Sequence, residues 1–234
     1  MIYWKEYSGH TLDIIGKKVQ FDKNIYTFDI ETTSYLILDG KQLSTDNYLK
    51  LDKKEQERCQ FMSTMYIWQF SINDVVYYGR TWQELYDFFE KIEIFTYSRN
   101  VRKIVYVHNL SFEFQFLSGI LEFYPDDVFA IDHRKVLKAT YDKTFEFRCS
   151  YLQTNMSLDA FTKKMGCEVR KLTGTFDYKK IRYPDTELSE DEIAYCVNDV
   201  RSLVEALKIE MASEDDNLCT IPLTYAPEYG VGVT

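Results

Sequence analysis

Residues 25–32 read Ile-Tyr-Thr-Phe-Asp-Ile-Glu-Thr, and this stretch decides the fold. Its aromatic and β-branched residues predict a buried strand over Ile25–Ile30. Asp29 and Glu31 are two positions apart, so both carboxylates project from the same face of that strand. Two acids on an apolar strand cost several kcal/mol unless metal ions or hydrogen bonds compensate, which predicts a metal site. The alternative is an edge strand whose polar face meets water, and the pair of acids alone does not exclude it.

Further strands and helices are predicted by the spacing of apolar residues and by turn and capping signals. Asn73 and Asp74 separate two strand patterns, which predicts a hairpin. Thr81–Glu84 and Ser189–Glu192 have the spacing of capping boxes, and an apolar stripe at helical spacing follows each. The predicted strands after the first are 65–70, 75–79, 104–107, 128–131, 136–141 and 145–149, and the predicted helices are 85–92, 110–121, 158–165 and 193–211.

The order of these elements is three strands, helix, strand, helix, strands, helix. We expect the first three strands to be antiparallel because they are consecutive, and a later strand to join them in parallel after a helical crossover. This outline is that of a ribonuclease H-like α/β fold, a mixed sheet flanked by helices. Residues 39–60 interrupt the outline with a polar segment rich in Lys, Asp and Glu, which is typical of an insertion.

Two other segments carry acidic residues at informative positions. His108–Glu113 lies at a turn from strand to helix, with Asn109 at the expected N-cap and Glu113 among phenylalanines. Helix capping and a solvated acid in the first turn would explain the same residues, and the histidine is also typical of a packed turn. Tyr195 and Asp199 lie four residues apart on one side of the last helix. Asp199 borders the apolar stripe, so we expect it to be at least half buried, although an ordinary polar position is the alternative.

Together, the three acidic segments match in order and spacing the three motifs of the DEDD exonuclease family, in its tyrosine subgroup. In detail the chain resembles the exonuclease domain of protein-primed family B DNA polymerases of phages and linear plasmids, over roughly residues 25–211. Residues 157–161, Ser-Leu-Asp-Ala-Phe, resemble a Ser/Thr-Leu-x-x-hydrophobic motif of that subgroup. Residues 171–174, Lys-Leu-Thr-Gly, followed by Phe-Asp-Tyr at 176–178, resemble its lysine motif.

The resemblance implies a role for each matching residue. Asp29, Glu31 and Asp199 would hold two divalent cations, Mg²⁺ or Mn²⁺, and Tyr195 would position the attacking water. Lys171 would lie near the scissile or adjacent phosphate, with a solvated surface lysine as the alternative. The residues expected to contact the 3' end of single-stranded DNA are Thr32, Asn109, Phe112, Ser157, Leu158 and Tyr178.

Glu113 departs from the family pattern, which has Asp at this position. Glutamate is one methylene longer, so either the helix that carries it lies farther back or activity is reduced. We expect Glu113 still to act as the fourth metal ligand, directly or through water.

Composition limits the possible partners and compartments. The chain has 234 residues, 45% of them apolar, and a net charge of −9, which argues against an extended basic surface for duplex DNA. A nuclease can instead gather acids around metal ions and hold a short single strand by stacking. The cysteine spacing supports neither zinc nor a disulfide framework, and there is no signal-peptide pattern or long apolar run. We expect no membrane association and a cytoplasmic protein, encoded by a phage or mobile element in a bacterial host cell.

The expected organisation has three parts. Residues 1–24 form an N-terminal extension packed on the domain, residues 25–212 the exonuclease domain, and residues 213–234 a tail resembling the lead-in to a polymerase region. No polymerase motifs follow, so this chain alone is expected not to polymerise DNA.

The predicted function is two-metal-ion 3'-5' exonuclease activity, which releases nucleoside monophosphates from single-stranded DNA. The chain would serve as a proofreading domain, partnered by a polymerase domain or another replication protein, or as a standalone trimming enzyme. The alternatives are a ribonuclease H-like nucleic-acid-binding module weakened in catalysis, and an exonuclease that trims RNA.

Overall fold

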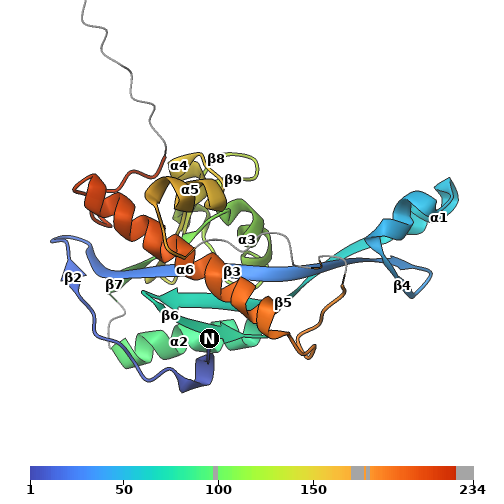
Figure 1. The fold of residues 1–234 in the computed structure, drawn as a ribbon, viewed down its shortest axis with the longest axis horizontal. Helices are drawn as coiled ribbons and strands as arrows, with labels where there is room; N and C mark the ends of the chain where they lie inside the picture. The colour runs from blue at the N-terminus through green and yellow to red at the C-terminus, as the bar shows by residue number, and fades with distance from the viewer. Residues whose placement is uncertain (97–99, 170–176, 178–179, 225–234) are drawn as a thin grey trace, which may run out of the picture.

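A computed structural model describes residues 1–96, 100–169, 177 and 180–224 (Figure 1). Within these residues, ten strands form one mixed sheet. The strands are β1 (Ile2–Tyr3), β2 (Ile14–Ile15), β3 (Gln20–Leu38), β4 (Lys41–Ser44), β5 (Gln60–Ile72), β6 (Val75–Gly79), β7 (Val101–Val107), β8 (Val128–Asp132), β9 (Lys135–Tyr141) and β10 (Phe145–Cys149). The helices are α1 (Lys53–Arg58), α2 (Trp82–Thr96), α3 (Leu110–Leu117), α4 (Ser150–Thr154), α5 (Leu158–Met165) and α6 (Glu190–Ser213), and short 3-10 turns are η1 (Trp4–Glu6), η2 (Thr45–Lys50) and η3 (Pro125–Asp127).

The strand order is β1-β6-β5-β3-β7-β10-β9-β8, with β2 and β4 attached to β3. Strands β3, β5 and β6 are antiparallel neighbours in the sheet, and β7 joins β3 in parallel after the crossover through α2. Strand β10 is parallel to β7 and antiparallel to β9. This topology confirms the predicted ribonuclease H-like fold, a mixed sheet flanked by helices.

Strand β3 lies in the middle of the sheet, hydrogen-bonded to β5 on one side and to β7 on the other. Its side chains alternate between two cores, because successive residues of a strand point to opposite faces. Tyr26, Phe28 and Ile30 are buried in one core, whereas Ile25 is buried in the other. The edge-strand alternative for the acidic pair is therefore wrong.

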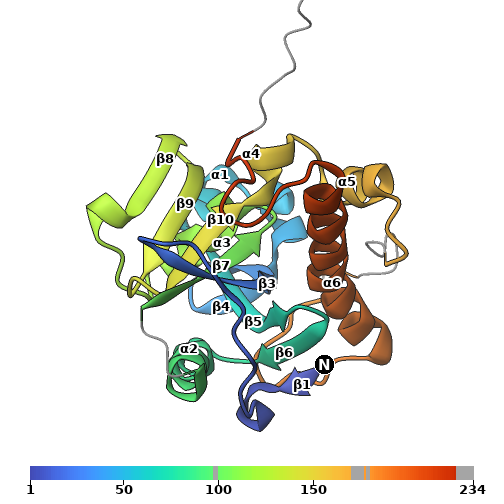
Figure 2. The same cartoon turned by 90° about the vertical axis from the view of Figure 1, so that its left-hand side faces the viewer.

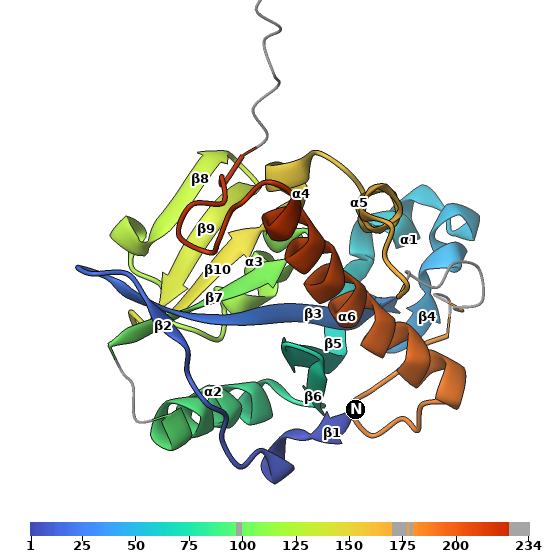
Figure 3. The ribbon, with the colours of Figure 1, turned by 60° about the vertical axis from the view of Figure 1, so that its left-hand side comes forward.

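Helices cover both faces of the sheet (Figure 2). Helices α2 and α3 bury apolar residues such as Phe88 and Leu110 against one face. Helices α5 and α6 bury Phe161 and Leu203 against the other. Helix α6 crosses the sheet over β3 and β5 (Figure 3). The hydroxyl of Thr27 on β3 donates to the carbonyl of Val200 on α6 at 3.0 Å, which fixes the helix on the strand.

Local signals place several helix ends as the sequence predicts. At α6, the Glu192 amide donates to Ser189 Oγ and the Ser189 amide donates to Glu192 Oε2, which completes the capping box. Helix α5 ends at Gly166, whose φ of 71° lies in the left-handed region that glycine adopts without strain. Helix α3 ends at Leu117, before the predicted residue 121, although Leu121 remains in the core.

A long ribbon extends from the body beyond the acidic pair (Figure 1). We call it the arm and define it as residues 33–64, which include the ends of β3 and β5 with β4, η2 and α1. The arm contains the predicted insertion at 39–60, but β3 is longer than the predicted strand because it continues to pair with β5 as far as Ile37. In β4, near the turn that follows β3, Gln42 Oε1 accepts a hydrogen bond from the Tyr183 hydroxyl at 2.6 Å.

The first residues of the chain pack on the sheet. Strand β1 pairs in parallel with β6, and Trp4 and Tyr7 are buried in the same core as α2. None of the helices in the described part of the chain is both long enough and apolar enough to cross a membrane.

Candidate active site

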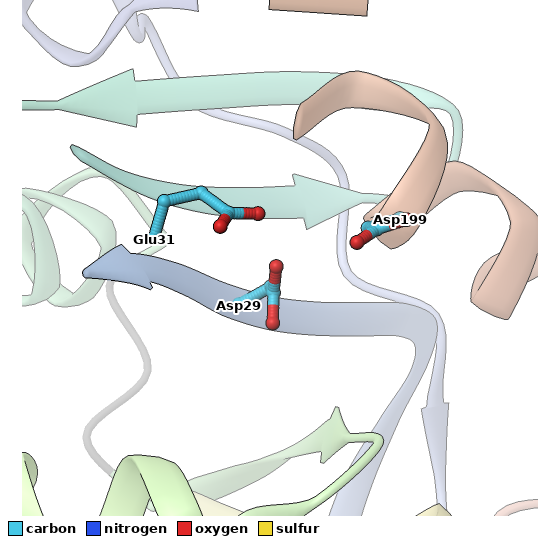
Figure 4. A group of neighbouring side chains, drawn as sticks. All are labelled: Asp29, Glu31 and Asp199. Atoms are coloured by element: carbon cyan, nitrogen blue, oxygen red, sulfur yellow. The ribbon is translucent and has the colours of Figure 1, made fainter. Parts of the chain in front are cut away.

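Three carboxylates meet where α6 passes over β3 (Figure 4). Asp29 and Glu31 come from β3 and Asp199 comes from α6, and one oxygen of each lies within 4.8 Å of the others. Asp199 is only 7% exposed, as its place beside the apolar stripe predicts, and the two strand acids are partly buried. We call these three residues the acidic triad.

The acidic triad forms because β3 and α6 each present their acidic side chains toward the other element. Strand alternation puts Thr27, Asp29 and Glu31 on one face of β3. The Thr27 hydroxyl donates to the carbonyl of Val200, the residue that follows Asp199, and this hydrogen bond holds α6 against β3. Helix α6 therefore presents the Asp199 carboxylate to Asp29 and Glu31, although Asp199 lies near the opposite end of the described chain from these two acids.

A cavity of about 200 Å³ opens beside the triad. Asn109 and Phe112 lie at its exposed side, Phe112 with 37% exposure, while Leu158 and Tyr195 are buried in its wall. The lining residues are Phe28, Asp29, Ile30, Glu31, His108, Asn109, Phe112, Glu113, Leu158, Tyr195, Asp199, Val200 and Leu203. The structure thus brings eight of the predicted site residues to one cavity: Asp29, Glu31, Asn109, Phe112, Glu113, Leu158, Tyr195 and Asp199.

Glu113 lies in the first turn of α3 and is 4% exposed, so the solvated-acid alternative is wrong. Burial raises the pKa of its carboxyl well above the usual range, and the adjacent charge of Asp29 raises it further. Its Oε2 has no hydrogen-bond partner among the described residues. Glu113 therefore adds a fourth carboxyl beside Asp29, although it is not one of the three whose oxygens converge most closely.

Asn109 occupies the N-cap position of α3, but its side chain makes no capping hydrogen bond. Helix capping, the alternative explanation for Asn109, therefore does not account for an asparagine at this position. His108, one residue earlier, holds the turn: its Nδ1 contacts Ser150 Oγ at 3.0 Å, and its carbonyl accepts from the Tyr151 amide at 2.8 Å. Its ring also lines the cavity.

Burial and the clustered negative charge raise the pKa of two neighbouring side chains. Burial raises the pKa of the Cys196 thiol well above its usual range, and the charges of Glu31, Asp29 and Asp199 add to this effect. The pKa of the Tyr66 hydroxyl is also raised, first by burial and then by Glu31. A cation bound between the carboxylates would relieve this repulsion.

The donor set fits a hard divalent cation. The converging ligands are carboxylate oxygens, which suit Mg²⁺ or Mn²⁺ better than zinc. The buried Oε2 of Glu113 offers a further oxygen of the same kind.

Other predicted site residues lie elsewhere. The Ser157 hydroxyl accepts from the Ala160 amide at 3.2 Å and so caps α5, a role that its spacing from the helix start would have predicted. Neither Ser157 nor Thr32 lines the cavity. Lys171 and Tyr178 lie outside the described residues.

Sequence reasoning missed Gln69 of β5, which pairs with Asp29 in the sheet. The available signal was a single amide side chain within the apolar run 65–70.

No protein-family model and no curated protein matches the sequence. Among solved structures, the chain is similar to Phi29 DNA polymerase in a ternary complex with primer-template DNA and incoming nucleotides. That match has a TM-score of 0.56 and 16% identity, and covers 83% of this chain and 32% of the polymerase. A second match, to Phi29 DNA polymerase complexed with single-stranded DNA, has a TM-score of 0.56 and 15% identity, and covers 82% and 32%. The two proteins share a fold. The chain spans about a third of the length of the polymerase chains that it matches.

Proposed function

We propose that this chain is a 3'-5' exonuclease that removes nucleoside monophosphates from single-stranded DNA with the help of two divalent cations. The observation that carries the proposal is the convergence of Asp29, Glu31 and Asp199, with Glu113 beside them, in one cavity that Tyr195 also lines. The fold shared with Phi29 DNA polymerase supports it, because solved complexes of that protein contain single-stranded and primer-template DNA.

The acidic triad and Glu113 would hold the cations, Mg²⁺ or Mn²⁺. When bound, these ions would stabilise negative charge on the attacking and leaving oxygens of phosphodiester hydrolysis. The chain's contribution is to hold four carboxyl groups on two helices and one central strand, whose packing prevents them from moving apart.

The remaining cavity residues would bind and orient the DNA end. Phe112 has an exposed ring on which a terminal base can stack, and Leu158 provides an apolar wall. Asn109 can hydrogen-bond to the same nucleotide, because α3 does not use its side chain as a cap. Tyr195 is a full helical turn before Asp199 and would orient the attacking water with its hydroxyl.

The proposal extends to residues whose roles rest on the family resemblance. Lys171 would neutralise a phosphate, and Thr32, Ser157 and Tyr178 would contact the strand near its 3' end. Residues 25–212 would form the exonuclease domain, and the chain would act in proofreading or as a separate trimming enzyme.

A nuclease assay tests the proposal. A 5'-labelled single-stranded DNA oligonucleotide incubated with the protein and Mg²⁺ or Mn²⁺ should shorten stepwise from its 3' end. Asp29→Ala should slow trimming at least about 100-fold, since losing several kcal/mol of charge stabilisation costs a factor of ten per 1.36 kcal/mol.

The matched control is Asp126→Ala, which removes an exposed acid that does not line the cavity and should leave the rate unchanged. A matched RNA oligonucleotide run in parallel measures the preference for DNA. Absence of trimming by the wild-type protein with either metal contradicts the proposal, and DNA binding without trimming would identify a binding module instead.

A further inference from the structure

The face of the sheet beneath α6 is built from three pairs of directly opposed residues on β3 and β5. Thr27 faces Ser71, Asp29 faces Gln69, and Glu31 faces Ile67. In an antiparallel pair, opposed residues share a face and their Cβ atoms lie about 5 Å apart. Gln69 is therefore the immediate cross-strand neighbour of Asp29, on the same side as the acidic triad.

Gln69 is fully buried, with 0% exposure. Its side chain contacts the Cys196 thiol of α6, but neither its Nε2 nor its Oε1 has a hydrogen-bond partner of ordinary geometry among the described residues. In the adjacent pair, by contrast, both side chains have hydrogen-bond partners. The Thr27 and Ser71 hydroxyls are 2.7 Å apart, and Thr27 also donates to α6. The unsatisfied amide is therefore confined to the pair that contains Asp29.

A buried polar group without a partner is costly, by about 1–3 kcal/mol, and such groups are rare in folded proteins. Ile67, Trp68 and Phe70, the nearest neighbours of Gln69 along β5, are buried apolar residues. The other buried polar side chain on this face of β5, Ser71, has a hydrogen-bond partner in Thr27. An apolar residue at 69 would avoid the cost, so the amide needs a reason beyond packing. Its chemistry supplies one, since a primary amide can both donate to a carboxylate and accept from water.

We propose that Gln69 is a positioning residue, whose amide donates to the carboxylate of Asp29 and holds it in the orientation that binds a divalent cation. This inference rests on the proposed metal-dependent function. Groups that hydrogen-bond to metal-binding carboxylates fix their direction, and their loss commonly reduces metal affinity 10-fold to 100-fold.

The test compares Gln69→Leu and Gln69→Met with the wild-type chain. Mn²⁺ affinity is measured by calorimetric titration, and the melting temperature is measured in EDTA. We expect both variants to bind Mn²⁺ at least about 10-fold more weakly. Their melting temperatures without metal should stay unchanged or rise, because an apolar side chain of similar volume replaces an unsatisfied amide.

The matched control is Ser71→Ala, one pair along the same ladder. It removes the contact with Thr27 and should lower the melting temperature without changing Mn²⁺ affinity. The inference is overturned if both Gln69 variants bind Mn²⁺ as tightly as the wild-type chain. It is also overturned if their Mn²⁺ affinity and their melting temperature fall together.

Asp29→Asn separates this inference from the proposed function. If that variant loses Mn²⁺ binding while the Gln69 variants keep it, only the role of Gln69 is wrong. If wild type and Asp29→Asn bind Mn²⁺ equally or not at all, the metal site itself is wrong and the role of Gln69 falls with it.

Discussion

At the scale of single residues, Glu113 combines a long side chain with deep burial beside Asp29. Burial and the adjacent acid both favour its protonated form, so its carboxyl has a raised pKa in the folded chain. The extra methylene that distinguishes it from the aspartate of the resembling family is thus accommodated inside the protein. Divalent cations would reverse this preference by stabilising the charged form.

The raised pKa of Glu113 predicts a pH-dependent stability in EDTA. The folded state keeps this proton to a higher pH than the unfolded state, where the pKa is about 4.3. The free energy of unfolding should therefore fall as pH rises from about 4.5 toward the folded pKa. Glu113→Gln should lack this fall, which urea unfolding between pH 4.5 and 8 can measure.

The same variant should also trim DNA at least about 10-fold more slowly, since it cannot supply a charged ligand oxygen to the site. The control is Glu122→Gln, which changes an exposed glutamate soon after α3. Parallel stability curves for wild type and Glu113→Gln would contradict the assigned electrostatics.

At this scale, spacing predicted which residues share a face of one element, whereas the meeting of these elements at one site was expected from the family resemblance. Asp29 and Glu31 share a face because strand side chains alternate, and Tyr195 and Asp199 share a side because helical residues repeat about every four. Gln69 could not be found in this way. Its importance depends on the register between β3 and β5, which is a property of the folded sheet rather than of either segment.

At the scale of elements, the sequence predicted those with strong local signals. The capping box before α6 and the glycine after α5 set ends that the structure reproduces. Strands β1, β2 and β4 were missed, because segments of two to four residues are too short to show a periodicity. The length of β3 was missed for a different reason: its far end is a strand only because β4 and β5 pair with it.

The arm is expected to be dispensable for folding of the body. Replacing residues 38–59 with Asn-Gly would join Ile37 to Gln60, a cross-strand pair, through a favourable two-residue turn. The change removes the Gln42 contact with Tyr183, worth about 1 kcal/mol, and uncovers Leu36, which costs about 2 kcal/mol. We expect a stability loss of about 3 kcal/mol by urea unfolding.

Trimming of a short oligonucleotide by this shortened chain should stay within about 3-fold of wild type, because no residue of the arm lines the cavity. As a control, Gln42→Ala should reproduce only the hydrogen-bond part of the stability loss. A shortened chain that folds but no longer trims would assign the arm a direct role in binding DNA.

At the scale of the whole molecule, an acidic protein must bind an acidic polymer. The net charge is −9, and no lysine or arginine is among the described residues that line the cavity. Affinity for DNA should then come from base stacking and from bound cations more than from basic side chains.

This charge distribution predicts a weak salt dependence of DNA binding. Each phosphate neutralised on a single strand contributes about −0.7 to the slope of log K against log salt concentration. With one or two such contacts, we expect a slope between about −0.7 and −1.4. Fluorescence anisotropy of a labelled oligonucleotide with Asp29→Asn, between 50 and 300 mM KCl, would measure it, and a slope steeper than about −3 would reveal an unrecognised basic surface.

The distance along the chain between the two halves of the acidic triad has a consequence for biosynthesis. A ribosome makes Asp29 and Glu31 early and Asp199 late, because α6 is the last helix in the described chain. A nascent chain that lacks α6 carries Asp29, Glu31 and Glu113 but not Asp199, so the acidic triad is incomplete. Under the proposed function, nuclease activity would therefore begin only after α6 has been synthesised and has folded onto β3, and chains terminated before α6 would be inactive.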